Sequence, residues 1–407
     1  MLALIFDAEV TGAQRNKGNP FDPRNRLCAV AHGMYLCNDQ SFMPDPHGLY
    51  PVLNIEHDQN HPYQHLLDVF QTKINLSDMV VGFNLKFDIH WLRRYGITFR
   101  DKRVWDCQLY HFIQSKQRHR MPSMDDVAAS WGEIKKLDIV KTEYWEKGLD
   151  TDQVPWHILE EYAEQDKKVN LAIFKKQWAE FQNLPDNRKK LILLQMKDLL
   201  VLQQMEYNGQ FYNREKSLRM GGELEKKIQE IDSRLAKLIL GEPINFNSDE
   251  QVSYFLYGGK IITKVREEYL FSYKDPKKAP IKKEHWIEKE RTLPRIFNPL
   301  ERTEKQKEGV YSTDKTTLLK LKKGASRFQM SIIDTLLERS KIEKRKSTYC
   351  FGTVKLLDEN CWENQTLHGQ FHQCVAVTGR LSSSKPNLQN QDEQMQVCFE
   401  SRFKWNN

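Results

Sequence analysis

Two carboxylates interrupt the first apolar run of this chain. Leu2–Phe6 has the sequence Leu-Ala-Leu-Ile-Phe, and Asp7 and Glu9 follow it directly. Because side chains alternate between the faces of a strand, Asp7 and Glu9 share one face. Two carboxylates in a core are unfavourable unless a cation neutralises them. The pair therefore lies either at a frayed, solvated strand end or in a cation site.

Two further acidic blocks accompany predicted helices. Asn84 and Asp88 are four residues apart, a spacing that allows both to lie on one side of a first helical turn. Tyr162 and Asp166 have the same spacing on a longer predicted helix. An ordinary Asn cap and a surface Asp would explain each block separately. The order of the three blocks, each on a suitable element, favours convergence at one site.

The residue types in these blocks favour a hard divalent metal. Mg²⁺ and Mn²⁺ prefer carboxylate oxygens, and the seven cysteines show no zinc spacing. In phosphodiester hydrolysis, two such ions about 4 Å apart stabilise the attacking and leaving oxygens together. The phenol of Tyr162 is better suited to orienting a water than to acting as a strong base near pH 7.

Length and composition limit the classes of protein to consider. With 407 residues, the chain is expected to form two or three domains. The net charge of +7 is compatible with a polyanionic partner but does not establish one. No apolar stretch approaches the roughly 18 residues that a membrane span needs. Since the cysteines show no pairing pattern, we expect a reducing, cytoplasmic compartment, bacterial or in a phage-infected host.

The predicted elements change character along the chain. Strands are expected near 2–6, 27–35, 41–43 and 79–81, with helices near 65–74, 89–95, 106–114, 125–131 and 158–179. After a break around Pro185, the pattern becomes helical and charged, with helices near 191–207, 214–240 and 329–349 and shorter ones after Ser248 and Thr313. An α/β part therefore precedes a mainly helical part.

The segment from Gly258 to Gly309 is expected to be irregular and charged. It contains two lysine pairs and four aromatic residues, Tyr269, Phe271, Tyr273 and Trp286. One interpretation is a solvated insertion. The other is a basic, aromatic surface that contacts single-stranded nucleic acid by charge and stacking, or contacts a partner chain.

A polar cluster near the C-terminus has side chains suited to nucleic acid. Thr378–Asn390 has the sequence Thr-Gly-Arg-Leu-Ser-Ser-Ser-Lys-Pro-Asn-Leu-Gln-Asn. Arg380 can place a guanidinium on phosphate or in the minor groove, and Lys385 adds charge. Amides for bases, sugars and phosphates come from Asn387, Gln389 and Asn390. By itself, the same composition would also suit a plain surface loop.

The acidic blocks resemble the DEDD superfamily of 3′–5′ exonucleases in its tyrosine branch. More narrowly, they resemble the proofreading domain of A-family, bacterial polymerase I-like DNA polymerases, with Asp7-Ala8-Glu9-Val10-Thr11 close to the usual Asp-x-Glu-Thr. The resemblance implies a ribonuclease H-like α/β fold, a mixed sheet with flanking helices. It implies two Mg²⁺ or Mn²⁺ ions held at the positions Asp7, Glu9, Asp88 and Asp166. Tyr162 and Glu9 would orient the water, and Asn84 is a candidate DNA contact.

Thr378–Asn390 resembles the segment that precedes the catalytic palm strand of the same polymerases. The resemblance implies three domains: an exonuclease over 1–182, a helical thumb over 187–350 with an insertion at 259–308, and an incomplete palm over 351–407. The family's polymerase metal ligands and fingers helix would follow Asn407, so nucleotide addition is not expected from this chain alone. We expect either a split gene or a truncated remnant. The apolar Val397-Cys398-Phe399 favours a second polypeptide that carries the fingers and the rest of the palm.

The sequence thus predicts a proofreading 3′–5′ exodeoxyribonuclease that is part of an A-family replicative DNA polymerase. Its expected substrates are single-stranded DNA 3′ ends and primer–template DNA. Two alternatives stay open. One is a free-standing exoribonuclease of the same superfamily, and the other is a non-catalytic DNA-clamping polymerase subunit.

Overall fold

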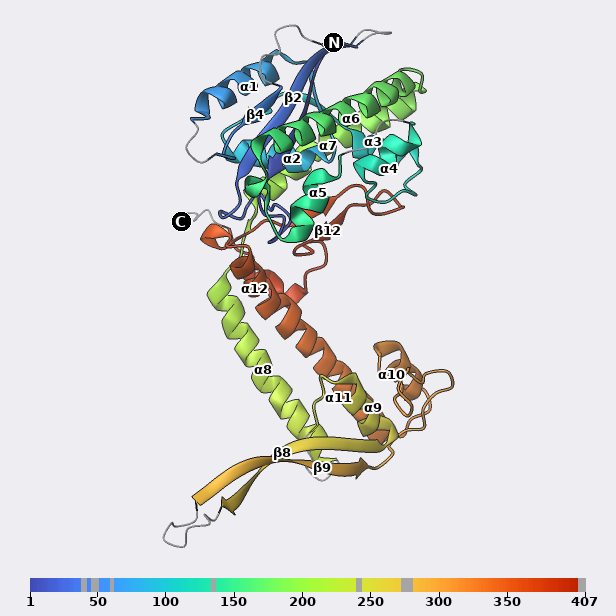
Figure 1. Ribbon diagram of the computed structural model, residues 1–407. Coiled ribbons are helices and arrows are strands. Elements are labelled where there is room, and N and C mark those ends of the chain that lie inside the picture. The colour runs from blue at the N-terminus through green and yellow to red at the C-terminus, as the bar shows by residue number, and fades with distance from the viewer. Residues whose placement is uncertain are drawn as a thin grey trace, which may run out of the picture. The chain divides into compact units, whose positions relative to one another are not determined.

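The chain folds into two compact units in the computed structural model (Figure 1). The structure describes residues 1–37, 42–44, 51–58, 62–132, 137–238, 244–271 and 281–401. Met1–Arg214 and Thr353–Asn407 make up the first unit, and Glu215–Gly352 is the second. These units differ from the predicted domain boundaries, since the helix after Pro185 and the C-terminal segment both belong to the first unit.

A mixed sheet forms the centre of the first unit. Its strand order is β3-β2-β1-β5-β6, with β4 also paired to β2. β1 runs antiparallel to β2 and parallel to β5, which is parallel to β6. The bounds are β1 Leu2–Val10, β2 Leu27–Cys37, β3 Phe42–Pro44, β4 Val52–Asn54, β5 Met79–Gly82 and β6 Arg103–Asp106. The predicted mixed α/β arrangement is confirmed, and β4 and β6 are strands that were not predicted from the sequence.

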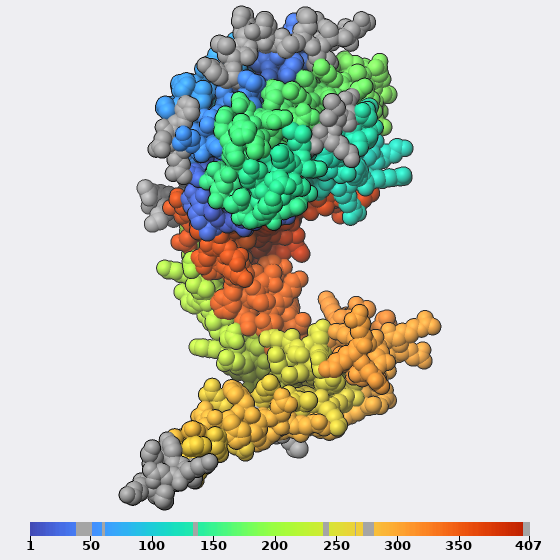
Figure 2. Space-filling view, in the orientation of Figure 1, coloured from blue at the N-terminus to red at the C-terminus, as the bar shows by residue number. Residues whose placement is uncertain are grey.

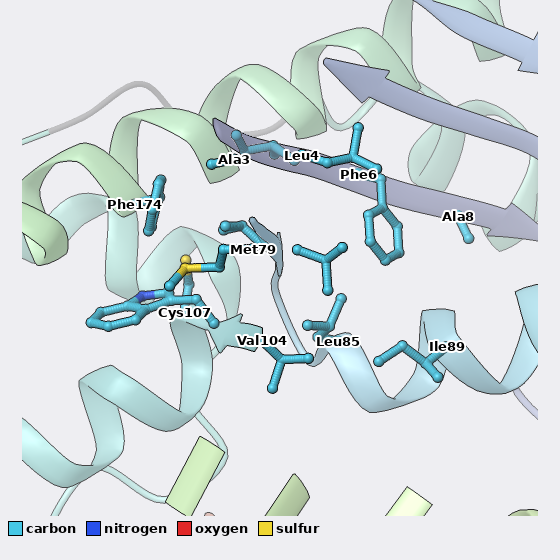
Figure 3. Close-up of a cluster of buried hydrophobic side chains, with 14 of the residues drawn as sticks. Ala3, Leu4, Phe6, Ala8, Met79, Leu85, Ile89, Val104, Cys107 and Phe174 are labelled. Carbon is cyan, nitrogen blue, oxygen red and sulfur yellow. The ribbon is translucent and has the colours of Figure 1, made fainter. Parts of the chain in front are cut away.

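Helices cover the two faces of this sheet. One face lies against α1 and α2, where the Phe6 ring meets Phe70 edge to face at 5.7 Å. Figure 3 shows Phe6 and Ala8 on the same side as Leu85 and Ile89 of α2. The other face is covered by α6, which contacts both β1 and β2. The bounds are α1 Gln64–Leu76, α2 Leu85–Arg94, α3 Cys107–Gln114, α4 Met124–Ser130, α5 Ile139–Glu143 and α6 Trp156–Gln182.

The next helix, α7 (Asp186–Asn208), packs against β6, α2 and α3. Ile192, Met196 and Leu199 are its buried apolar contacts, and they join the core of the sheet domain. α7 ends at Gly209, whose φ of 61° lies in the left-handed region and whose Cβ, if present, would meet Thr366 at 2.4 Å. This packing explains why α7 belongs to the first unit and not to a separate helical domain.

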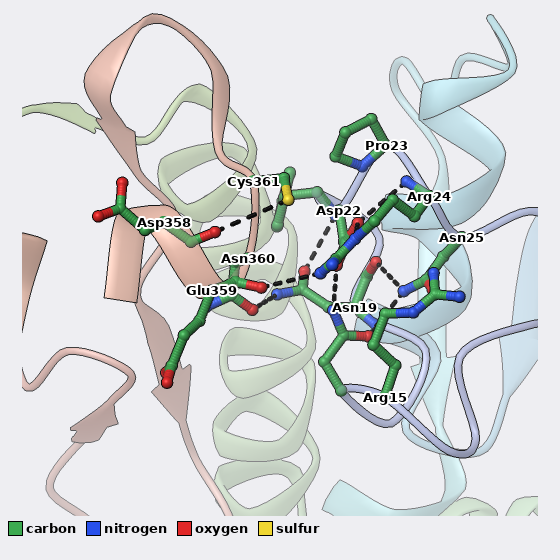
Figure 4. A network of polar contacts seen from close by, with 12 residues as sticks. Arg15, Asn19, Asp22, Pro23, Arg24, Asn25, Asp358, Glu359, Asn360 and Cys361 are labelled. Atoms are coloured by element: carbon green, nitrogen blue, oxygen red, sulfur yellow. Dashed lines mark hydrogen bonds and ion pairs between the residues drawn. The ribbon is translucent and has the colours of Figure 1, made fainter. Parts of the chain in front are cut away.

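The C-terminal segment returns to the first unit. β10 (Thr366–Leu367) pairs with β7 (Gln210–Phe211), and β11 (Gln370–His372) forms a hairpin with β12 (Ser382–Ser384). Figure 4 shows a second connection, between the loop that follows β1 and the end of α12 (Gly352–Glu359). There, Arg24 donates to the Glu359 carbonyl at 2.8 Å and the Asn19 amide donates to Asn360 at 2.9 Å.

The second unit combines helices with a long two-stranded ribbon. The helices are α8 (Arg214–Lys237), α9 (Asp249–Tyr257), α10 (Lys315–Lys322) and α11 (Arg327–Lys344), and a π-helical segment, Arg345–Phe351, follows α11. Arg339 of α11 is buried and paired with Asp232 of α8 at 2.5 Å. Within the described helices, none is long and apolar enough to cross a membrane.

The prediction of an irregular segment between Gly258 and Gly309 was wrong for half of its length, and Tyr273 lies outside the described residues. β8 (Gly259–Phe271) and β9 (Ile281–Leu293) are both regular strands, paired over 13 residues each. Most residues of both strands are exposed, so neither face needs a continuous apolar stripe. Without that stripe, the period-two signal of a half-buried strand is missing from the sequence.

Candidate metal centre

Three carboxylates from distant parts of the chain converge on the sheet. Asp7, Glu9 and Asp166 each offer an oxygen that lies within 4.8 Å of the others. Glu9 is 6% exposed and Asp166 only 1%. Asp7 and Glu9 lie within β1, which continues to Val10, so they are not at a frayed strand end. The structure therefore brings together three of the four predicted metal ligands.

Small residues on β2 allow α6 to approach these carboxylates. Asp7 pairs across the ladder with Ala31, and Glu9 pairs with Ala29. Both alanines are buried in one cluster with Leu159, Tyr162 and Ala163 of α6. Asp166 follows Tyr162 by four residues, so both side chains lie on the helix face that meets the sheet. The spacing of the Tyr162/Asp166 block thus has the expected structural consequence.

The fourth carboxylate, Asp88, lies beside β1. β1 pairs with β5 only as far as Ile5, and beyond that point the Ala8 amide donates to Asp88 Oδ1 at 3.3 Å. Burial raises the pKa of Asp88 well above its ordinary value, and the negative charges of Asp7 and Glu9 raise it further. The hydrogen bond from the Ala8 amide, which lies between Asp7 and Glu9 in the sequence, places Asp88 next to this part of β1.

Tyr162 is positioned one turn before Asp166. Its side chain is 6% exposed, and its ring meets Trp145 edge to face with centroids 6.1 Å apart. Because the ring is held by its neighbours, the phenol has a restricted range of orientations. Its predicted part in orienting a water stays a prediction.

Asn84 lies at the start of α2, four residues before Asp88. It occupies the N-cap position of α2 with a left-handed φ of 54°, and its side chain makes no cap hydrogen bond. Asn84 is exposed and lines a cavity of about 40 Å³ together with Asp106, Gln108 and His372. Asn84 therefore lies outside the regular helical geometry of α2, and its part in DNA contact stays a prediction.

Asp106, which was not among the predicted site residues, anchors the start of two helices. It caps α3 by accepting from the amides of Gln108 and Leu109 at 2.9 and 3.0 Å. It also accepts from the Leu85 amide of α2 at 2.9 Å. Burial raises the pKa of Asp106 even though these amides lower it. Asp106 therefore fixes the first turn of the helix that carries Asp88, and its place before a predicted helix was the available signal.

A second buried acid, Glu206 of α7, ties α2 to the C-terminal segment. Glu206 accepts from Lys86 at 2.6 Å, from His90 at 2.8 Å and from the Phe371 amide at 2.5 Å. The Lys86 ammonium also donates to the Phe371 carbonyl. Burial alone would raise the pKa of Glu206, but the hydrogen bond from His90 and the charge of Lys86 outweigh it and the pKa is lowered. No sequence spacing indicates this contact, because its members are far apart in the chain.

The predicted DNA-contacting residues of the C-terminal segment lie on the surface. The turn after β12 is held by Ser383, whose hydroxyl accepts from the Leu388 amide at 3.1 Å. Arg380 lies before β12, and the other four predicted residues follow it; all five are exposed: Arg380, Lys385, Asn387, Gln389 and Asn390. Their positions leave them accessible to a ligand, and their role stays a prediction.

The apolar edge expected at Val397–Phe399 is largely covered within the chain. Cys398 is fully buried, and Phe399 forms a β-bridge with Tyr212 and packs against its ring at 5.1 Å. Val397, at 49% exposed, is the apolar side chain of the three that faces solvent. The physical argument that this edge needs a second polypeptide is therefore wrong.

The donor set fits hard divalent cations. Asp7, Glu9, Asp88 and Asp166 supply only carboxylate oxygens, the ligand type that Mg²⁺ and Mn²⁺ prefer. The effect of Asp7 and Glu9 on the pKa of Asp88 shows that the group concentrates negative charge in a buried place. A bound cation would offset this repulsion, whereas protonation is the other way to relieve it.

Comparison with known proteins points to DNA polymerases. Residues 289–402 match the family described as DNA polymerase family A. DNA polymerase I of Bacillus subtilis is 29% identical over 197 residues, which cover 48% of this chain and 17% of the relative. The Synechocystis enzyme is 25% identical over 75% of this chain and 26% of its own length. The Helicobacter pylori enzyme is 23% identical over 95% of this chain and 35% of its own length.

The fold has a counterpart among solved structures. It matches the structure described as the POL domain of Pol1 from M. smegmatis in complex with DNA primer-template and dNTP, with a TM-score of 0.57 and 15% identity. The match covers 98% of this chain and 54% of that chain. The chain spans about a sixth to a third of the length of the curated relatives named above.

Proposed function

We propose that this chain is a 3′–5′ exodeoxyribonuclease that forms part of an A-family DNA polymerase. The observation that carries the proposal is the convergence of Asp7, Glu9 and Asp166 within 4.8 Å, with Asp88 buried beside them. A sheet of mixed order with helices on both faces is consistent with a ribonuclease H-like exonuclease fold. The similarity to DNA polymerase I supports DNA, and not RNA, as the substrate.

Asp7, Glu9, Asp88 and Asp166 would hold two divalent ions. Bound there, Mg²⁺ or Mn²⁺ would supply positive charge for the attacking and leaving oxygens of a phosphodiester. The protein's part is to fix the four carboxylates on β1, α2 and α6 before substrate arrives. Asp106 contributes by holding the first turn of α2.

Tyr162 and Glu9 would orient the attacking water. Glu9 is a member of the close carboxylate group, and Tyr162 lies one turn before Asp166 on α6. A phenol can donate and accept hydrogen bonds but is a weak base, so Tyr162 would position a water and would not take its proton. Positioning of this kind contributes to rate through orientation.

The C-terminal segment would contact primer–template DNA. Its exposed basic and amide side chains, before and after β12, are the types that contact phosphates and base edges. They lie within the part of the chain that matches DNA polymerase family A. Arg380 and Lys385 would supply charge, and Asn387, Gln389 and Asn390 would supply hydrogen bonds.

The test is degradation of a 5′-labelled single-stranded DNA in Mg²⁺. The wild type should produce a ladder that shortens from the 3′ end, and Asp7→Asn or a chelator should abolish it. Glu161→Gln, which neutralises an exposed carboxylate on the same helix as Asp166, is the matched control and should cleave like the wild type. An intact strand with wild-type protein would refute the nuclease. Faster cleavage of an RNA strand of the same sequence would refute the choice of DNA.

A further inference from the structure

The two faces of the β8–β9 ribbon carry different charge arrangements. Residues directly opposite in the ladder share a face, and the register pairs Arg266 with Trp286 and Tyr269 with Lys283. One face, called the paired face here, consists of the even-numbered residues from Lys260 to Leu270 and from Lys282 to Thr292. The odd-numbered residues of both strands form the opposite face, called the basic face.

The paired face is electrically balanced. It carries four basic and four acidic side chains, and each base pairs with an acid: Lys260–Glu290, Lys264–Glu288, Arg266–Glu284 and Lys282–Glu268, at 2.6 to 3.6 Å. Its aromatic residue is Trp286, and the Arg266 guanidinium carbon lies 4.9 Å from the centre of the Trp286 ring. This face therefore offers little net attraction to a polyanion.

The basic face lacks this balance. Lys283 lies across the ladder from Tyr269, and Lys289 lies across from Thr263, so neither meets an acid. Within the described residues, no ion pair joins Lys283 or Lys289 to a carboxylate. Arg291 is a third base on this face, and Glu267 is its one acid among the strand residues. The excess of base over acid favours a negatively charged partner.

Aromatic rings accompany these bases. Tyr269 and His285 meet edge to face at 4.9 Å, and the Lys283 ammonium lies 3.8 Å from the centre of the Phe271 ring. Tyr269, Lys283, His285 and Lys289 are exposed. In Figure 2, other atoms do not cover most of the visible side of the ribbon. Bases interleaved with exposed rings are the combination that binds single strands, by phosphate contact and by stacking.

We propose that the basic face of the β8–β9 ribbon binds single-stranded DNA. Lys283 and Lys289 contact phosphates, and Tyr269 and His285 stack on bases. Tyr269, Lys283 and His285 lie before the residues that match DNA polymerase family A, and Lys289 is the first residue of that match. The proposal does not depend on the nuclease, because it concerns binding at residues that take no part in hydrolysis.

The test is a comparison of two full-length variants that change charge equally. Lys283→Gln with Lys289→Gln removes two positive charges from the basic face, and Lys264→Gln with Lys282→Gln removes two positive charges from the paired face. Affinity for a fluorescently labelled oligothymidylate is measured by anisotropy in chelator, so that no hydrolysis occurs. The basic-face variant should bind about tenfold more weakly at 0.1 M salt, and its log–log salt slope should fall by about 1.4, or 0.7 for each lost phosphate contact. The paired-face variant should bind like the wild type.

A stacking variant provides a second readout. Tyr269→Ser should weaken binding without changing the salt slope. Trp286→Ser, on the paired face, should not weaken binding. Far-ultraviolet circular dichroism and thermal unfolding check that each variant folds. Equal losses in the two charge variants, or wild-type binding by the basic-face variant, would overturn the proposal. If the basic-face variant loses binding to single strands but keeps binding to duplex DNA, the proposal is supported. If it loses binding to duplex DNA but keeps binding to single strands, the proposal is overturned.

Discussion

The carboxylate group of the first unit and the ribbon of the second hold charge in opposite ways. On β1, α2 and α6, four acids are gathered in or beside the core, and burial raises the pKa of Asp88. On the paired face of the ribbon, four acids are exposed and each lies near a base. Buried like charges oppose folding, whereas exposed opposite charges have little effect on stability. The arrangement that folding disfavours is the one that needs a function to explain it.

Removing one buried acid should give the largest effect. Asp166→Asn should lower exonuclease activity by roughly 10²- to 10³-fold, because one fixed charge of the site is lost. In chelator, the same variant should unfold at a higher temperature than the wild type, because a source of repulsion is gone. Activity is measured on a 5′-labelled single strand and stability by calorimetry. A less stable variant that keeps full activity would place Asp166 among ordinary structural residues.

A buried acid with partners should behave differently from the carboxylate group. Glu206→Gln removes the charge that Lys86 and His90 share, and we expect a loss of about 3 kcal/mol in the free energy of unfolding. Denaturant titration measures this change, with Glu161→Gln on the exposed side of α6 as the control. If Glu206→Gln is as stable as the wild type, the charge of this partnered acid does not stabilise the fold, and the contrast with the carboxylate group is wrong.

The pH dependence of stability without metal separates the two regions further. In the unfolded chain, Asp88 releases its proton as the pH rises above the ordinary pKa of 3.8. In the folded protein the pKa of Asp88 is raised, so the proton stays bound to higher pH. The free energy of unfolding in chelator should therefore fall as pH rises from that value through the pKa of folded Asp88. Between these two pKa values, the fall should be about 1.4 kcal/mol for each pH unit. Asp88→Asn should flatten this part of the curve. An unchanged curve would show that Asp88 does not carry the repulsion.

The smallest effect is expected on the ribbon. Glu284→Gln breaks an exposed pair with Arg266, whose atoms lie 3.2 Å apart, and should change the free energy of unfolding by less than about 0.5 kcal/mol. Raising the salt concentration should reduce even this difference. A loss above about 1 kcal/mol would mean that the ribbon depends on its ion pairs and that the contrast with the buried group is weaker.

The sequence predicted those features that depend on local pattern. β1, β2 and β5 are apolar runs, and each of them was predicted as a strand. Asp7 with Glu9, and Tyr162 with Asp166, lie as their spacing on a strand and on a helix requires. In each case, the period of one element was enough to place the side chains.

Features that depend on distant contacts were missed. Glu206 meets Lys86 across 120 residues, and no local period indicates that pairing. Phe399 was predicted to face a partner chain, but it meets Tyr212 of the same unit. The strands of the β8–β9 ribbon were missed for another reason, because strands exposed on both faces carry no alternation between apolar and polar residues. Tertiary contacts and double exposure thus set the limit of the sequence-based prediction.

The most direct test of a two-metal site is anomalous diffraction from crystals grown with Mn²⁺. Our account predicts two anomalous peaks about 4 Å apart, each within coordination distance of carboxylates from the group Asp7, Glu9, Asp88 and Asp166. Asp7→Asn crystals should lose at least one of them. Wild-type crystals with no peak within reach of these carboxylates would contradict the account.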